Sequence, residues 1–520
     1  MTVNSVSRRS FVKSAAGCAA AATGLALAAP GMALAEESAE LVASEVKEAQ
    51  VVIIGAGISG LSAAVQCAQN GLGTLVLERA ETTGGNGLYA NGIFAVGSTP
   101  HIESGVEFDT GALIRSVMKD AQNRVDGSLW TDLLEATPAN YDWMVENGVT
   151  FDGLTNEYIP IPDPTMLWFK DSLAGVGYVP AMEETARSNG AEFVFGARAE
   201  QLIMQDGKAV GVYARLADDS ILQVNADAVI IATGGFAENM ELYKEAGWNV
   251  EHALYTGLPG HTGDGYRMAI AAGARSAIKD TASMNRLHID GMPFYGTATM
   301  GLTFGGPFLW VNSYGRRFID ENFSADNATS LPFAVNSTKA LWSIADQKIV
   351  NMALNVDGLA DVGEITADPR DEIAAAIEAC PSNNIFTADT FEELAQKCGL
   401  PADTLLASIE SYNALCAAGN DDQFGKDPSM MIPIDEPPYY IYRLDITYIV
   451  SIGALDTDHN MQVVNTDGDP IDGLYAIGVD GVRLYRNVYP FIGLVGGGTC
   501  VAHCVNSGRV AANNIASQLA

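Results

Sequence analysis

Three glycines and one acid near the N-terminus have the spacing of a dinucleotide-binding turn. The segment Gly55-Ala56-Gly57-Ile58-Ser59-Gly60 follows an apolar run from Val51, and a helical pattern and a second apolar run lead to Glu78. Such glycines allow a tight turn, a close approach of pyrophosphate to the backbone, and close packing of helix on strand. The helix N-terminus would bind the phosphates, and Glu78 stands where an acid binds a ribose hydroxyl. The alternative is a tight βαβ turn without a ligand.

Further glycine-rich loops follow predicted strands. Thr83-Gly84-Gly85-Asn86 and Asn91-Gly92 form a loop suited to lying against a flat ligand. A buried strand is predicted from Ala228 to the loop at Gly234-Gly235, and Asp206-Gly207 predicts a hairpin turn before it.

Similar signals return near the C-terminus. Gly473 to Asp480 predicts a strand with an acid at its carboxyl end, and Gly496-Gly497-Gly498 begins a final helix. Residues 283–448 differ, because they carry helical patterns over 371–379, 390–397 and 401–417. The chain is therefore expected to hold one dinucleotide domain split by an inserted domain.

The first 35 residues have the pattern of an export signal. Ser7-Arg8-Arg9-Ser10-Phe11-Val12-Lys13 precedes an Ala-rich apolar run and the small-residue site Ala33-Leu34-Ala35. This predicts a cleaved twin-arginine signal over residues 1–35 and an extracytoplasmic protein without stable membrane insertion, the alternative being an uncleaved anchor. Because no soluble NADH pool exists outside the cytoplasm, the expected dinucleotide is FAD.

Charge and cysteine spacing exclude several classes of protein. The net charge of −34 disfavours binding to nucleic acid and to anionic membranes. The cysteines form neither a CxxC pair nor a CxxCH motif, so no haem, no obvious iron–sulfur cluster and no metal site is predicted. Cys500 and Cys504 lie one helical turn apart and are interpreted as small core residues, with a metal site as the alternative. A disulfide elsewhere remains open.

Together these motifs resemble the flavoprotein family of soluble fumarate reductases, urocanate reductases and 3-ketosteroid dehydrogenases. The resemblance covers nearly the whole mature chain. It implies an α/β fold, with a Rossmann-like FAD-binding domain of the glutathione-reductase type over 36–282 and 449–520. An α+β capping domain over 283–448 would be inserted into it. The motifs that carry the resemblance are the 55–60 glycines with Glu78, Gly84-Gly85-Asn86, Ala232-Thr233-Gly234-Gly235, Arg316-Arg317-Phe318-Ile319-Asp320-Glu321 and Gly473–Asp480.

The resemblance also implies which residues hold a non-covalent FAD. The 55–60 glycines would bind the pyrophosphate, Glu78 the adenosine ribose, and the last helix would point its N-terminus at the flavin N1/O2 edge. Asp480 would meet the ribityl or phosphate region, or instead cap a strand end. The full predicted set is Gly55, Ala56, Gly57, Ile58, Ser59, Gly60, Glu78, Arg79, Gly84, Gly85, Asn86, Asn91, Gly92, Ala199, Thr233, Gly234, Asp264, Asp480, Gly497 and Gly498.

Cationic residues that the fumarate reductases use are replaced in this chain. Ala325 stands where that family has its proton-donating Arg, and Ile449 to Ser451 stand where it has a substrate His. Leu494 or Val495 replaces the final substrate Arg. A buried dicarboxylate without paired charge costs several kcal/mol. Fumarate and succinate are therefore poor candidates, and a neutral or singly charged, more apolar substrate is expected.

Tyr489-Pro490-Phe491-Ile492-Gly493 matches a pattern of the ketosteroid dehydrogenases. In that family the Tyr hydroxyl and the Gly N–H bind the substrate ketone, so the resemblance gives these roles to Tyr489 and Gly493. Two such donors would stabilise the enolate that forms as hydride enters the β-carbon. The alternative is a Tyr that only packs in a loop before a helix.

Other candidates are weaker. Tyr485 is a possible proton donor or a packing residue, and Arg486, like Arg483, either reaches a carboxylate or faces solvent. His288 falls near the start of the capping domain, where the family keeps a substrate histidine. His261 either lies close to the flavin or only helps to close its loop.

The function predicted from these residues is that of an exported FAD-dependent oxidoreductase, which reduces a C=C bond next to a carbonyl. The proton donor would be Tyr485, Tyr489, Arg486 or water. Electrons would come from a separate redox protein, a haem or FMN carrier fed by membrane quinol in anaerobic electron transport. One alternative is a ketosteroid-type dehydrogenase that runs in the desaturating direction, and another is a non-catalytic flavin carrier.

Overall fold

The computed structural model describes residues 41–154, 165–290, 306–322, 334–335, 337–338, 340–353, 369–379, 384–481, 483–489 and 497–520. The chain divides into Met1–Val42 and one compact unit, Ala43–Ala520, to which the following description refers.

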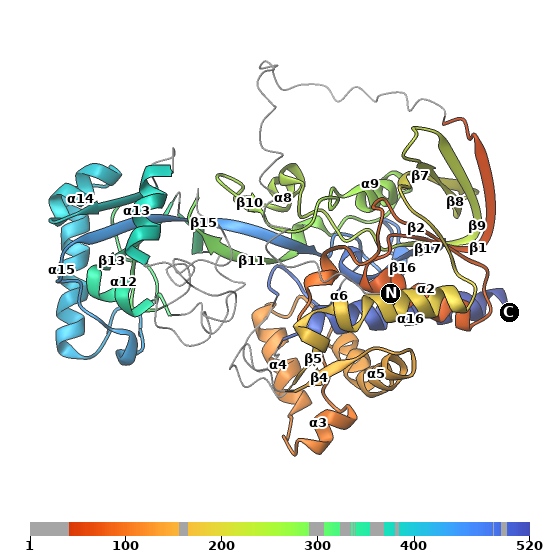
Figure 1. Ribbon diagram of the computed structural model, residues 1–520, viewed down its shortest axis with the longest axis horizontal. Helices are drawn as coiled ribbons and strands as arrows, with labels where there is room; N and C mark the ends of the chain where they lie inside the picture. The colour runs from red at the N-terminus through yellow and green to blue at the C-terminus, as the bar shows by residue number, and fades with distance from the viewer. Residues whose placement is uncertain are drawn as a thin grey trace, which may run out of the picture. The chain divides into compact units, whose positions relative to one another are not determined.

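An eight-stranded sheet forms the centre of the dinucleotide-binding part (Figure 1). Its main order is β16-β17-β9-β1-β2-β6, and β7 and β8 continue from β9 as an antiparallel meander. β1 pairs in parallel with both β2 and β9, and β17 pairs in parallel with β9. The bounds are β1 Glu45–Ile54, β2 Thr74–Leu77, β6 Glu192–Val194, β7 Arg198–Gln205, β8 Lys208–Arg215, β9 Ile221–Ile231, β16 Gln462–Val464 and β17 Pro470–Ala476.

Strand β1 is apolar on both faces, which is why Val51 to Ile54 read as an unbroken hydrophobic run. Val51 and Ile53 belong to a core that contains residues of helices α2 (Ile58–Gln69) and α16 (Thr499–Leu519). Val52 and Ile54 belong to a second core on the other side of the sheet. Successive side chains of a strand point to opposite faces, so both faces are covered, as is usual for parallel strands.

Helices α2 and α16 lie side by side against the sheet (Figure 1). A glycine permits their close approach, since a Cβ atom at Gly508 would lie 2.7 Å from the carbonyl oxygen of Ser59. This contact connects the C-terminal helix directly to the helix that follows the first glycine turn.

Most elements predicted from the sequence are confirmed. β1, α2 and β2 form the predicted βαβ unit, and β7 and β8 form the hairpin around Asp206-Gly207. The final helix begins at Thr499, after the predicted glycines. A further helix, α9, spans Asp264–Ala271. The inserted segment contains the expected helices, α13 Pro369–Ala379, α14 Phe391–Cys398 and α15 Ala402–Ala418.

A helical region with a small sheet lies between β2 and β6. Helix α5, Gly127–Glu146, packs against α16, and the three-stranded sheet has the order β3-β5-β4. The remaining bounds of this region are β3 Gly92–Phe94, α3 Thr99–Glu103, α4 Thr110–Asp120, β4 Phe151–Gly153, β5 Met166–Phe169, α6 Ala174–Gly177 and α7 Val179–Ser188.

The long strand β15, Tyr439–Ile452, is the centre of a second, six-stranded sheet. Its first half pairs with β13 and β14, and its second half pairs with β10 and β11. β15 spans the predicted domain boundary at 448/449, and β11 spans the one at 282/283. Both boundaries remain predictions. The other strands of this sheet are β10 Leu254–Tyr255, β11 Ala282–His288, β12 Leu309–Asn312, β13 Leu341–Asp346 and β14 Ile385–Ala388. Two short helices are α8, Met240–Ala246, and α12, Gln347–Ala353.

The Arg317–Glu321 motif builds a buried ion network in the inserted segment. Arg317 donates to both carboxylate oxygens of Glu321, at 2.8 and 2.9 Å, and to Asp421 at 2.7 Å. Lys426 lies 3.3 Å from Glu321 and also donates to the carbonyl of Phe308. Two cations face two anions, and none of the four side chains is more than 4% exposed.

Acid is expected to weaken this network through Asp421. Burial alone would raise the pKa of Asp421, but hydrogen bonds from Arg317 and from three backbone N–H groups outweigh it and lower this pKa to about 2. The folded pKa is therefore below the unfolded value of 3.8. The stabilisation is complete above about pH 4 and is lost as the pH falls through 2, a change of roughly 2 kcal/mol.

Urea unfolding at a series of pH values between 4 and 2 measures this effect. Asp421→Asn should flatten the pH dependence of the free energy of unfolding in this range, whatever its own cost in stability. An identical slope in the variant would contradict the assignment.

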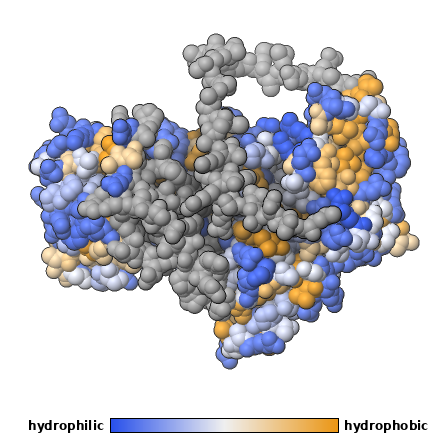
Figure 2. All heavy atoms as spheres, in the orientation of Figure 1, coloured by the Kyte–Doolittle hydropathy of each residue, from blue (hydrophilic) through white to orange (hydrophobic). Residues whose placement is uncertain are grey.

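No helix in the described ranges combines the length and the apolar character needed to cross a membrane. Figure 2 shows a face on which hydrophilic residues predominate over the described parts, in keeping with the net charge of −34. Hydrophobic residues gather over the region of β7, β8 and β9, at the right of the view.

Candidate functional site

A cavity of about 790 Å³ opens at the carboxyl ends of β1, β2 and β9. This edge of a parallel sheet is where α/β folds bind ligands. We call it the large cavity. The predicted cofactor residues that line it are Gly55, Gly57, Ile58, Ser59, Glu78, Arg79, Gly84, Gly85, Asn86, Asn91, Gly92, Ala199, Thr233, Gly234, Asp264, Gly497 and Gly498.

The turn between β1 and α2 offers a cradle for phosphate. Helix α2 begins after Gly57 and has no side-chain cap, so the N–H groups of its first turn are directed at the cavity. A Cβ atom at Gly57 would meet a single neighbour, the carbonyl oxygen of Gly84 at 3.8 Å. The space beside this turn therefore fits the pyrophosphate of a dinucleotide.

Two alanine substitutions should separate binding from folding at this turn. Gly57→Ala adds a methyl group beside open space, so the stability of the protein without its dinucleotide should not change. Dinucleotide affinity should fall by about 1–3 kcal/mol, the usual cost of an extra methyl group in a close-fitting site. Gly60→Ala should instead destabilise the fold, since its Cβ would lie 1.9 Å from the carbonyl oxygen of Gly55.

Thermal unfolding with the dinucleotide removed, and the amount of dinucleotide that copurifies, measure the two effects. Equal losses of stability in both variants would contradict this distinction.

The carboxylate of Glu78 binds backbone N–H groups next to the same turn. One carboxylate oxygen accepts from the N–H of Ala56 and the other from the N–H of Ala80, both at 2.8 Å. These bonds hold the carboxylate at the cavity wall, where it can accept further hydrogen bonds from a ribose.

A charged cluster forms one part of the wall. Arg198 donates two hydrogen bonds to Asp264, at 2.8 and 2.9 Å, and Arg79 lies 3.8 Å from the same carboxylate. Burial would raise the pKa of Asp264, but the hydrogen bond and charge of Arg198 lower it overall. Both arginines are thus already paired with an anion of the protein.

The loop around Asn86 is tied to two other segments. Asn86 donates to the carbonyl of Ile449 at 3.1 Å and accepts from the N–H of Leu258 at 2.6 Å. His261 lines the cavity, and its Nδ1 lies 2.9 Å from both the hydroxyl of Tyr255 and the carbonyl of Leu258. Burial lowers the pKa of His261, so the ring is neutral at pH 7. His261 therefore both closes its loop and borders the cavity.

Asp480 has a different position from the one that the resemblance implies. Its carboxylate is 3% exposed and is not among the described residues that line the cavity. It accepts from the Thr233 hydroxyl at 3.0 Å and from the N–H groups of Gly234 and Gly235 at 3.0 and 3.2 Å. Asp480 thus positions the glycine loop, and Thr233 and Gly234 of that loop border the cavity.

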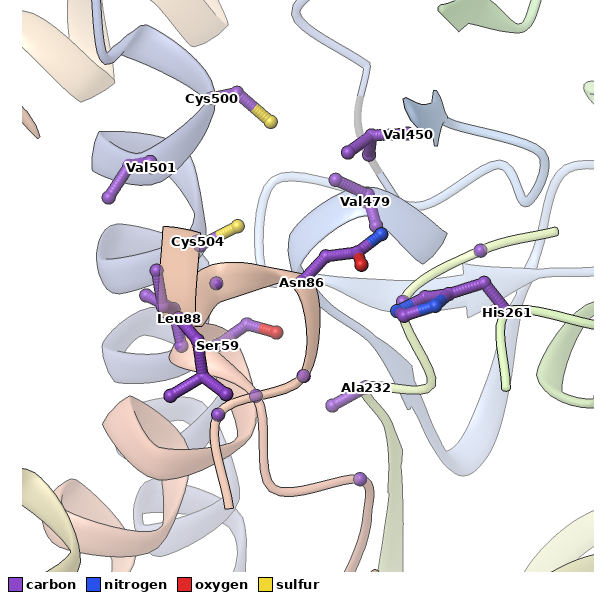
Figure 3. A pocket seen from close by; sticks show the side chains of 18 of the residues that line it. Ser59, Asn86, Leu88, Ala232, His261, Val450, Val479, Cys500, Val501 and Cys504 are labelled. Atoms are coloured by element: carbon purple, nitrogen blue, oxygen red, sulfur yellow. The ribbon is translucent and has the colours of Figure 1, made fainter. Parts of the chain in front are cut away.

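The rest of the wall is largely apolar. Figure 3 shows the sulfur atoms of Cys500 and Cys504 on the side of α16 that faces Val450, Val479 and Asn86. We call this part the apolar wall; it consists of Phe108, Met166, Trp168, Met284, Val450, Ile452, Val479, Tyr489, Cys500, Val501 and Cys504.

Tyr489 is the hydroxyl-bearing residue of the apolar wall that the sequence singled out. It is 3% exposed, and its hydroxyl group forms hydrogen bonds with the Thr499 side chain and with the N–H of Cys500 in the first turn of α16. Burial raises the pKa of Tyr489, and these hydrogen bonds oppose the increase only in part. The hydroxyl is therefore protonated at pH 7 and can donate.

The other predicted catalytic residues do not line the large cavity in the described structure. Tyr485 is buried behind Tyr489, with ring centroids 5.0 Å apart. Arg486 forms ion pairs with Asp280 and Asp456 instead of facing solvent. His288 is buried on β11, opposite Asp445 of β15.

Two groups of predicted positions remain: residues that are not described, and residues of the glycine turn that are absent from the cavity wall. Gly493, Ala325, Leu494 and Val495 lie outside the described residues. Ala56 and Gly60 lie in the glycine turn, but their own atoms are not part of the cavity wall.

Sequence reasoning missed most of the apolar wall. Phe108 lies in the loop before α4, Trp168 on β5 and Met284 on β11; they carry no motif, so only the folded chain brings them together. Cys500 and Cys504 were interpreted as small core residues; both pack against the core, and both also border the cavity, which the sequence analysis did not predict. A signal was present: they lie in the first two turns after a glycine loop expected to face the cofactor. Within the described ranges, no group of three or more His, Cys, Asp or Glu residues could hold a metal ion.

Comparison with known proteins agrees with this geometry. The family described as "FAD binding domain" matches residues 50–493. A vinyl phenol reductase of Lactiplantibacillus plantarum is 30% identical over 88% of this chain and 94% of its own length. A fumarate reductase (cytochrome) of Shewanella frigidimarina is 25% identical over 92% of this chain and 79% of its own length.

Solved structures support the fold. The structure of a 3-ketosteroid-Δ4-(5α)-dehydrogenase of Rhodococcus jostii superimposes with a TM-score of 0.67 at 23% identity, covering 90% of this chain and 97% of the other. The predicted α/β fold with a capping domain is therefore confirmed.

Proposed function

The chain belongs to this FAD-binding family of fumarate reductase-like flavoproteins, and from that premise we propose a substrate class for it. It is an FAD-dependent oxidoreductase of CH–CH bonds. The proposed reaction is reduction of a C=C bond that is conjugated with a carbonyl group or a phenol ring. The substrate is apolar and carries at most one negative charge.

The apolar wall is the observation that supports this proposal. The arginines among the described lining residues are Arg79 and Arg198, and both are engaged by Asp264. Arg486 is engaged by Asp280 and Asp456. Among the described residues, a dicarboxylate against the apolar wall would thus meet no arginine that is not already paired, and an unpaired buried charge costs several kcal/mol. Phenols and monocarbonyl compounds bring no carboxylate pair into the site, so their binding does not include this cost.

Tyr489 is proposed to hold the oxygen of the substrate. Its side chain borders the large cavity, and burial raises the pKa of its hydroxyl group, so this group is protonated at pH 7 and is a possible donor to a substrate. A donor aimed at an oxygen that gains negative charge lowers the barrier by roughly 3–4 kcal/mol. The role of Gly493 as a second donor stays a prediction.

The similarity to a vinyl phenol reductase favours a phenolic substrate among these compounds. A vinyl phenol is neutral, has one hydroxyl group that can form a hydrogen bond with Tyr489, and has a flat ring that fits between apolar side chains. For this substrate Tyr489 positions the ring, whereas stabilisation of an enolate oxygen applies to the carbonyl compounds of the class. FAD, when bound, supplies a hydride to the double bond. The chain's own residues orient the substrate, exclude water and hold the oxygen.

Export and the electron donor complete the proposal. The twin arginines at Arg8 and Arg9 support transport of the folded holoprotein to an extracytoplasmic location. A separate haem or FMN protein linked to quinol would supply electrons, since the sequence contains no CxxCH motif. The name of the fumarate reductase (cytochrome) relative supports a haem partner.

Anaerobic reoxidation of the viologen-reduced holoprotein tests the substrate class. Vinyl phenols, hydroxycinnamates, enones and ketosteroids form the panel, and fumarate is the charged control. Faster reoxidation with the panel than with fumarate is expected, and brisk turnover of fumarate would refute the proposal. A dye-linked assay with the saturated products tests the desaturating direction.

A further inference from the structure

The loop before α4 brings a carboxylate to the edge of the large cavity. Val106, Glu107 and Phe108 are consecutive in this loop, and all three line the cavity. Val106 is 38% exposed, Glu107 is exposed, and Phe108 is partly exposed. We call residues 106–108 the rim segment, because it borders both the cavity and solvent.

The contacts of Phe108 place the rim segment beside the apolar wall. The ring of Phe108 packs edge-on against that of Phe94, with ring centroids 6.1 Å apart. The N–H of Phe94 donates to the carbonyl of Gly498 at 3.2 Å. Gly498 directly precedes α16, and Cys500 of this helix belongs to the apolar wall. The rim segment is thus next to the surface on which the substrate is proposed to bind.

Glu107 differs from the other charged residues that line the cavity in the described structure. Arg79 and Arg198 are engaged by Asp264. The carboxylate of Glu78 accepts from two backbone N–H groups. Glu107, in contrast, has neither an ion pair nor a hydrogen bond among the described residues. An exposed carboxylate carries a negative charge at pH 7.

The charge of Glu107 is not offset by a nearby cation in the described wall. Its two arginines are already paired, and the described lining residues include no lysine. Three segments outside the described residues, 291–305, 323–333 and 490–496, contain no Lys, Arg or His in the sequence. Within the described structure, an anion that approaches the apolar wall therefore meets an uncompensated negative charge.

We propose that Glu107 is a specificity-determining residue, which selects neutral substrates over carboxylates by electrostatic repulsion at the rim of the large cavity. This inference rests on the proposed function and narrows its substrate class to uncharged phenols and enones. A binding site discriminates against a competitor by adding a repulsive group as well as by omitting an attractive one. Glu107 supplies the repulsive group, and the apolar wall omits the attractive one.

The repulsion should increase with the charge of the substrate. For two unit charges about 10 Å apart, at an effective dielectric constant between about 20 and 80, it changes a binding constant by roughly 2- to 15-fold. A dicarboxylate carries two charges, so this factor applies twice, whereas a neutral vinyl phenol is not affected. Because Glu107 is exposed, salt should weaken the repulsion, with a screening length of about 10 Å at 0.1 M.

Kinetics of the reduced holoprotein at low ionic strength test this inference. The measured quantity is the specificity ratio, defined as kcat/KM for a hydroxycinnamate, which carries one carboxylate, divided by kcat/KM for a vinyl phenol. Glu107→Gln should raise this ratio by about 3- to 10-fold, through the hydroxycinnamate alone. Fumarate, measured as an inhibitor of vinyl phenol reduction, should bind more tightly to the variant by about the square of the same factor.

Salt gives a second measurement that needs no substitution. Added 0.5 M NaCl, a concentration of about the order at which the screening length falls to a few Å, should raise the specificity ratio of the wild type. The same salt should leave the ratio of Glu107→Gln nearly unchanged, because its rim carries no charge to screen.

Two further variants serve as controls. Glu107→Asp keeps the charge and should keep the wild-type ratio. Glu103→Gln removes an exposed acid at the end of α3, four residues before Glu107, that does not line the cavity, and it should also keep this ratio. The flavin absorbance of each purified variant shows whether its cofactor site is intact.

An unchanged specificity ratio in Glu107→Gln would overturn the inference. An equal gain for the charged and the neutral compound would also overturn it, since that result indicates a change of shape and not of charge. A wild-type protein that reduces no compound of the panel would instead refute the proposed function.

Discussion

Tyr489→Phe is expected to lower the rate of substrate reduction by about 10²–10³-fold while the protein keeps its flavin. The substitution removes one hydroxyl group from the apolar wall and leaves a ring of nearly the same shape. Without this donor, negative charge on the substrate oxygen must develop beside Val450, Met284 and other apolar side chains. The loss should appear in the maximal rate more than in substrate affinity, because the hydrogen bond strengthens as charge develops.

Anaerobic reoxidation of the reduced variant measures this loss, and the flavin absorbance of the purified protein shows whether the cofactor site is intact. Tyr475→Phe serves as the control for loss of a buried hydroxyl group, because Tyr475 donates to Asn514 of α16 and is not part of the wall of the large cavity. Unchanged turnover in Tyr489→Phe would remove Tyr489 from the reaction.

Glu321→Ala is expected to destabilise the inserted segment by about 3–5 kcal/mol. Glu321 is fully buried and accepts from Arg317 and from the N–H of Trp310, and Lys426 lies 3.3 Å away. Its removal leaves two buried cations to share the carboxylate of Asp421. The effect is large because the substitution leaves a buried positive charge without a partner. It does not measure the net stabilisation that the intact ion pair provides.

Urea unfolding followed by the fluorescence of the tryptophans measures this change. Glu393→Ala is the matched control, because Glu393 forms a similar i,i+4 ion pair with Lys397 but is 47% exposed. The control should cost no more than about 0.5 kcal/mol. Equal effects of the two substitutions would contradict the role given to burial.

The parts of the fold that carry a local pattern could be predicted from the sequence. The βαβ unit at Gly55 to Glu78 has glycines whose positions follow from backbone contacts, and the structure contains it as predicted. The final helix was found for the same reason, since a glycine loop marks its start. The substrate side of the site has no such pattern, because β5, β11 and α16 each contribute only one to three ordinary apolar residues.

The contacts of Asp480 and Glu321 could not be predicted from residue type alone. Asp480 could have faced a ligand, but the N–H groups of the Gly234–Gly235 loop use its carboxylate instead. Glu321 belongs to a motif of the fumarate reductase family, yet in this structure its described contacts are with Arg317, Lys426 and a backbone N–H. Which partner an acid meets depends on segments that are distant in sequence.

Strand β15 connects strands of the inserted segment with the wall of the large cavity. It carries β13 and β14 at one end, and at its other end Val450 and Ile452 form part of the apolar wall. Beside it, the register of β11 shifts between Met284 and Asn285, so the ladder is irregular where Met284 meets the cavity. A rotation of the outer half of β15 would therefore shift Val450 and Ile452 in the cavity wall, and the irregular pairing at Met284 is where the strand pair would bend.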